Sequence, residues 1–102
     1  MNDDLERDLH LEKVREMHAK ELLSNPVMQE ALEAIRREIV DQWEAAPIRD
    51  KDGKEALWQL YKVTAKFEAT LKGYIESGKL ATERLRVEEG RMAKVRQFLN
   101  RA

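Results

Sequence analysis

The 102-residue chain has no cysteine, only two prolines and four glycines, and aromatic residues make up 6% of it. The absence of cysteine excludes disulfides and thiolate metal sites. With so little proline and glycine, the sequence predicts few turns and therefore few, long elements. No apolar run approaches the roughly 18 residues that a membrane-spanning helix needs, which predicts a protein without membrane contacts.

Charged residues, in contrast, make up 38% of the chain, which is typical of long solvated helices with narrow apolar stripes. The formal net charge is −1, but residues 1–50 carry a net −6 and residues 51–102 a net +5. Such an asymmetry favours contact between the two halves, or between two subunits. Because the acidic N-terminus is unlike a secretory or mitochondrial leader, we expect a soluble protein that is not exported.

The stretch from Asp52 onward carries an unbroken seven-residue repeat. Its two tracks are Leu57, Thr64, Leu71, Gly78, Leu85, Met92 and Leu99, and Leu60, Phe67, Tyr74, Ala81, Glu88, Val95 and Ala102. A strict repeat of this kind keeps one stripe of a helix facing a partner in a left-handed coiled coil. It predicts one long helix over residues 52–100 that continues through Gly78, the alternative being a bend or break there. Asp52 and Glu55 have the spacing of a capping box at its start.

Two further helices precede it. Residues 1–24 predict a first helix whose start is frayed, and Asn25 is the natural cap of a second helix that begins at Pro26. This second helix spans residues 26–45, carries its apolar residues on one face and ends before Pro47. The short loop that follows makes the second and third helices antiparallel neighbours.

The sequence thus predicts an all-α single domain of three main helices: a helical hairpin with a long, coiled-coil-like C-terminal helix. The predicted hairpin core is Met28, Leu32, Ile35, Ile39, Trp43, Leu57, Trp58, Leu60 and Phe67. We expect the distal half of the long helix to lack a partner in its own chain and to drive self-association, most simply as a dimer. The residues of this predicted seam are Leu71, Tyr74, Leu85, Met92, Val95 and Leu99. In the alternative, the first helix folds back onto the distal half.

No catalytic, metal-binding or cofactor-binding pattern stands out. His10 and His18 are eight residues apart, too far for two ligands on one helical face, and the Asp50–Gly53 stretch lacks two ligands of a calcium loop. The residues from Lys79 to Arg101 carry a net +4, which could contact nucleic acid. The candidate phosphate contacts in this segment are Arg84, Arg86, Arg91, Lys94 and Arg96. The alternative interpretation is a charged flank of a coiled coil.

Residues 19–81 show a helical pattern interrupted by Asn25-Pro26, a Pro-x-Arg-Asp-x-x-Gly loop from Pro47 to Gly53, and the Leu57-Trp58 pair. In these features the chain resembles a family of small helical proteins of tailed bacteriophages and prophages, often encoded among virion-assembly genes. The resemblance implies a helical fold and a phage context, and it implies no active site.

We therefore expect a non-enzymatic structural or assembly protein of a phage particle. It would be located in the host cytoplasm during assembly or in the virion, with further copies of itself or other phage structural proteins as partners. A nucleic-acid-binding accessory protein is the second hypothesis. An adaptor or inhibitor of a host protein, binding through the N-terminal segment, is the third.

Overall fold

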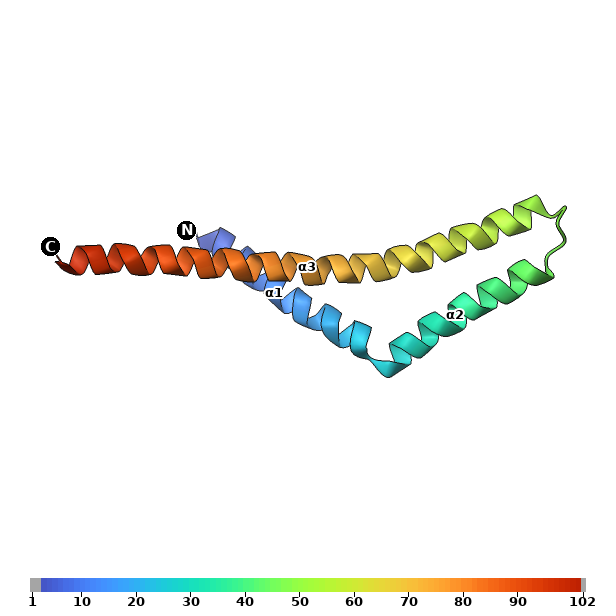
Figure 1. Cartoon of the computed structure of the whole chain (residues 1–102), viewed down its shortest axis with the longest axis horizontal. Helices are drawn as coiled ribbons and strands as arrows, with labels where there is room; N and C mark the ends of the chain where they lie inside the picture. Colours follow the sequence, from blue (N-terminus) through green and yellow to red (C-terminus); the bar gives the residue numbers. More distant parts are fainter. Residues whose placement is uncertain (1–2, 102) are drawn as a thin grey trace. The chain divides into compact units, whose positions relative to one another are not determined.

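The computed structural model describes residues 3–101 and consists of three helices joined by short connections (Figure 1). They are α1 (Asp3–Ser24), α2 (Pro26–Ala45) and α3 (Lys51–Arg101). The predicted all-α fold class is confirmed, and α3 is a single helix of 51 residues that continues through Gly78. The predictions for residues 1–2 and Ala102 lie outside the described residues.

The junction between α1 and α2 has its predicted chemistry. The Asn25 side chain accepts hydrogen bonds from the backbone N–H groups of Val27 and Met28, at 2.8 and 3.3 Å, and Pro26 occupies the first position of α2. Proline fits there because that position has no helical acceptor for an N–H group. The Gln29 amide donates to the Leu23 carbonyl at 2.7 Å, which ties the first turn of α2 to the end of α1.

The start of α3 corrects a prediction. Asp50, rather than Asp52, is the capping residue, because its carboxylate accepts the backbone N–H of Gly53 at 3.0 Å. The Asp50 N–H in turn donates to the Pro47 carbonyl at 3.0 Å, so the turn after α2 closes within four residues and α3 begins early. Glu55 does not return a bond to the cap; its carboxylate accepts the Gln59 amide at 2.9 Å.

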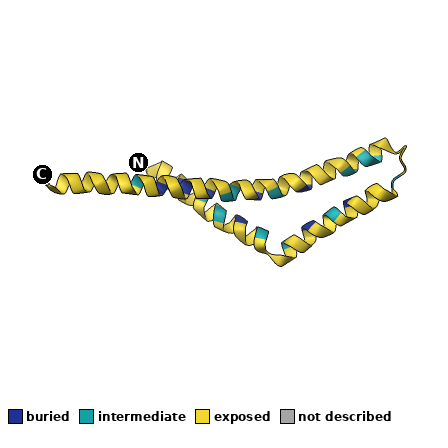
Figure 2. Cartoon of the chain, in the orientation of Figure 1, coloured by how far each residue is buried: buried dark blue, intermediate teal, exposed yellow. Residues whose placement is uncertain are grey.

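The chain forms two compact units. Unit 2 comprises residues 20–72, where α2 runs beside the first part of α3, and its buried residues are Leu32, Ile39, Thr64 and Leu71. Unit 1 comprises residues 3–19 and 73–101, where α1 lies against the distal part of α3. Its buried side chains are Leu9, Ala19, Ala81 and Leu85. In both units the buried positions form narrow stripes, as Figure 2 shows by the few dark segments along each helix.

Unit 1 corrects the expectation that the distal half of α3 has no partner in its own chain. Leu9 of α1 forms a buried cluster with Ala81 and Leu85, so α1 folds back onto α3 as in the alternative arrangement. Gly78 is buried at this contact, and a Cβ atom at its position would lie 2.2 Å from the Cβ of Glu16. The glycine therefore permits the close approach of the two helices.

The predicted hairpin core is buried only in part. Leu32 and Ile39 are buried, and Met28 and Leu57 are half-buried. The other five are two-fifths or more exposed: Ile35, Trp43, Trp58, Leu60 and Phe67. Two helices bury only one narrow stripe of each other, and residues on both sides of that stripe need a further layer to cover them. The described residues do not supply that layer.

Candidate self-association surface

The distal end of α3 carries apolar side chains that the described residues of unit 1 leave exposed. We call Met92, Val95, Phe98 and Leu99 the distal stripe; their exposed fractions are 41%, 44%, 73% and 63%. Three of them continue the heptad tracks whose earlier members, Ala81 and Leu85, are 1% and 4% exposed. The same repeat is therefore buried where α1 accompanies it and exposed where α1 is absent.

The register of α1 on α3 explains where the cover stops. Leu9 contacts Ala81 and Leu85, and the Arg15 guanidinium lies 5.1 Å from the centre of the Tyr74 ring. Contacts thus move back along α3 as α1 advances, so the two helices are antiparallel. Because α1 begins at Asp3, less than two turns before Leu9, its cover extends less than two turns beyond Leu85. Glu88 is the last described residue of α3 that is half-buried, and all described residues after it are exposed.

The predicted seam is accordingly divided. Leu71 and Leu85 are buried within the chain, and Tyr74 is half-buried beneath Arg15. These three residues are therefore covered within their own chain, contrary to the prediction that they face a second chain. Met92, Val95 and Leu99 are exposed, so they alone of the predicted seam are available to another molecule.

The five predicted phosphate contacts also divide. Arg86 donates to Glu83 at 2.6 and 3.1 Å, and Arg91 forms an ion pair with Glu88. These arginines lower the pKa of the two carboxyl groups, and Glu83 raises the pKa of Arg86. Arg84, Lys94 and Arg96 form no ion pair within the described part of the chain.

Unit 2 has an apolar surface of its own, which we call the aromatic groove. It has a volume of about 440 Å³ and is lined chiefly by Ile39, Val40, Trp43, Leu57, Trp58 and Tyr61. The rings of Trp58 and Tyr61 stack with centres 5.6 Å apart. The Lys54 Nζ atom lies 4.7 Å from the centre of the Trp43 ring, and the Lys62 Nζ atom lies 5.6 Å from the centre of the Trp58 ring. Each tryptophan thus has a cation–π contact. The sequence pattern predicted both tryptophans as core residues, whereas they are 41% and 45% exposed and line an open groove.

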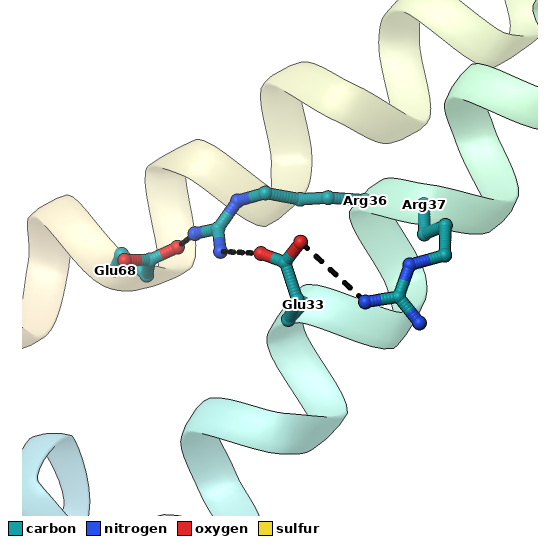
Figure 3. A network of polar contacts seen from close by, with 4 residues as sticks. All are labelled: Glu33, Arg36, Arg37 and Glu68. Atoms are coloured by element: carbon teal, nitrogen blue, oxygen red, sulfur yellow. Dashed lines mark ion pairs between the residues drawn. The ribbon is translucent and has the colours of Figure 1, made fainter.

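A polar bridge between α2 and α3 was also missed. Arg36 of α2 forms an ion pair with Glu68 of α3 (Figure 3). Glu33 lies beside both Arg36 and Arg37, at 3.9 and 3.8 Å. Arginine has a long side chain that reaches around the helix edge, and the helical pattern alone gives no signal for this contact.

The outward face of α1 is the third apolar surface. Leu11, Val14 and Met17 are 55%, 45% and 51% exposed, because the inward face of the helix is formed by Leu9, Glu16 and Ala19. These three side chains therefore face away from α3.

Residues 3–101 contain no group of three or more side chains arranged to hold a metal ion. Within the same residues, none of the helices has a stretch long and apolar enough to cross a membrane.

Comparison of the chain with protein-family models, with curated proteins and with solved structures gave no match.

Proposed function

We propose that the protein is a non-enzymatic structural protein that acts in assembly through helix-mediated self-association and protein–protein contacts. The observation that carries the proposal is the distal stripe, the continuation of a heptad repeat whose members Ala81 and Leu85 are buried against α1 and whose members from Met92 onward are exposed. A surface of this kind is stabilised when a second helix removes it from water, by about 25 cal/mol per Å² of apolar surface. The assembly of a bacteriophage particle is the proposed context, and it rests on the sequence resemblance.

The test is the solution mass of the full chain, measured by light scattering over a hundredfold range of concentration. We expect a monomer–dimer equilibrium that shifts to the monomer when Met92, Val95 and Leu99 are replaced by serine. The matched control replaces Val27, Ile48 and Val63, which are 72%, 90% and 64% exposed and lie off the stripe. This control should leave the equilibrium unchanged. A full chain that is monomeric throughout would contradict the proposal.

Nucleic-acid binding is the second candidate, favoured by the cations that lack an acidic partner within the described chain. We expect Arg84→Glu/Lys94→Glu/Arg96→Glu to abolish any binding to duplex DNA in low salt, because contact with phosphate is electrostatic. The matched control is Lys13→Glu/Arg49→Glu/Lys66→Glu, three exposed cations elsewhere. Equal affinity of the two variants, or no binding by the parent chain in low salt, would exclude this function.

A further inference from the structure

The part of α3 that extends past the start of α1 is a defined segment, residues 92–101, which we call the overhang. Every described residue from Glu89 to Arg101 is exposed, and Figure 1 shows α3 continuing beyond the start of α1. At 1.5 Å per residue, the overhang is about 15 Å long. Along this length, no described residue of unit 1 covers the side of α3 that α1 covers at Ala81 and Leu85.

The charges of unit 1 are strongly separated. Residues 91–101 contain four basic side chains and no acidic one, whereas residues 3–12 contain five acidic side chains and one basic one. If two overhangs paired in parallel, like cations would lie at the same level, and Arg91 would flank the second copy's Arg96 across the stripe. Like charges at such positions destabilise the pair, so parallel pairing is disfavoured.

Antiparallel pairing reduces this conflict: the contacts between Arg91 and the second copy's Arg96 are lost, and only the two Arg96 side chains, near the centre of the overlap, lie close to each other. With Val95 opposite the second copy's Leu99, the two overhangs overlap along their whole length and stop where each meets the α1 of the other copy. Arg101 then lies next to the second copy's Asp3 and Asp4. The carboxyl end of one α3 also faces the amino end of the other copy's α1, which is the favourable orientation of two helix dipoles.

We propose that two copies pair through their overhangs in antiparallel orientation, each overhang taking the place beside α3 that a longer α1 would fill. This inference rests on the proposed self-association and adds the orientation and the ionic contact between chain ends. The distal stripe is thereby assigned to a second copy of this chain, on the basis of the complementary charges of the basic overhang and the acidic start of α1.

The orientation is tested by one spin label on each copy of the full chain. Because the chain has no native cysteine, Val87→Cys gives a single labelling site; Val87 is 56% exposed and lies outside the overhang. Antiparallel pairing centred on residue 97 separates the two labels by about 30 Å, whereas parallel pairing places them about 10–15 Å apart. The longer of these two distances supports the proposal, and the shorter one overturns it.

The ionic contact is tested by charge reversal in low salt, with the dimer dissociation constant as the readout. We expect Arg101→Glu alone, and Asp3→Lys/Asp4→Lys alone, each to weaken the dimer about three- to tenfold. Combining the three substitutions should restore it. The control combination, Lys66→Glu with Asp41→Lys, reverses exposed charges away from the overhang and should leave the constant unchanged.

The outcomes separate the two proposals. A monomer at all concentrations overturns both the self-association and the antiparallel pairing. A dimer with the shorter label distance, or a dimer whose weakened charge variants are not rescued by combination, overturns the antiparallel pairing alone. A dimer lost on Trp43→Ala/Trp58→Ala and kept by the distal-stripe variant assigns self-association to the aromatic groove, and likewise overturns it.

Discussion

At the scale of single residues, the four glycines have different roles although all of them lie in α3. A Cβ at Gly78 would collide with the Cβ of Glu16 at 2.2 Å, whereas one at Gly73 or Gly90 would meet no atom within 4 Å. Sequence alone weighs every helical glycine equally, as a loss of about 1 kcal/mol relative to alanine. The structure thus separates Gly78, where a larger residue has no room, from Gly73 and Gly90, where it has.

We predict opposite effects for Gly78→Ala and Gly73→Ala on the free energy of unfolding. Gly73→Ala should stabilise the protein by up to about 1 kcal/mol through helix propensity. Gly78→Ala should destabilise it by about 1 kcal/mol, because overpacking costs about 1–3 kcal/mol and the propensity gain offsets only part of that. Urea unfolding followed by circular dichroism measures both. If Gly78→Ala is as stabilising as Gly73→Ala, the close contact with Glu16 is absent in solution.

At the scale of elements, an ion pair between Arg36 and Glu68 joins α2 to α3. The Arg36–Glu68 pair is partly shielded, since the two side chains are 36% and 21% exposed. Removing one partner of a shielded pair leaves the other charge poorly solvated, which costs more than the net value of the intact pair.

We therefore predict that Arg36→Ala lowers the free energy of unfolding by about 1–2 kcal/mol. Arg36→Met/Glu68→Leu should recover most of that loss, because it removes both charges and keeps their volume. The control is Arg37→Ala, whose only described ion pair is the exposed contact with Glu33 on the same helix, and which should change stability by less than about 0.5 kcal/mol. Urea unfolding again supplies the free energies. A double variant no more stable than Arg36→Ala would contradict this account.

The elements themselves could be predicted from the sequence because their signals are local. Asn25-Pro26 marks the start of α2, and the unbroken heptad phase around Gly78 indicates one continuous helix. The cap of α3 was misplaced by two residues, since Asp50 and Asp52 both have the chemistry of a cap and only the turn after Pro47 selects between them. Burial was harder to predict, because a heptad repeat shows which face seeks a partner and not which helix covers it.

At the scale of the whole chain, more large apolar side chains are exposed than buried among the described residues. Among the described residues, 21 large apolar side chains are exposed, whereas the buried ones of comparable size are Leu9, Leu32, Ile39, Leu71 and Leu85. Isolated exposed apolar residues are normal on proteins, but a repeat of them along one helix is typical of an interaction surface. The folded state should therefore gain stability from association.

We predict that the melting temperature rises with protein concentration, by about 3–5 °C for each tenfold increase in the range where the dimer forms. Association adds free energy to the folded state only, so mass action raises the transition. Scanning calorimetry of the full chain measures this, with the Met92→Ser/Val95→Ser/Leu99→Ser variant as the control that should show a constant transition. If the melting temperature of the variant rises with concentration as much as that of the parent chain, the distal stripe is not the association surface.

The way α1 is paired also determines when each unit can form during synthesis. Unit 2 closes through contacts between helices that follow each other in the chain, such as the Arg36–Glu68 pair of α2 and α3. Unit 1 closes only when Leu9, near the start of the chain, meets Ala81 and Leu85 in its last quarter. Local contacts form quickly and distant ones slowly. Of the three helices, α1 is thus synthesised first and finds its partner last, and until Leu85 has been synthesised both faces of α1 are open to other proteins.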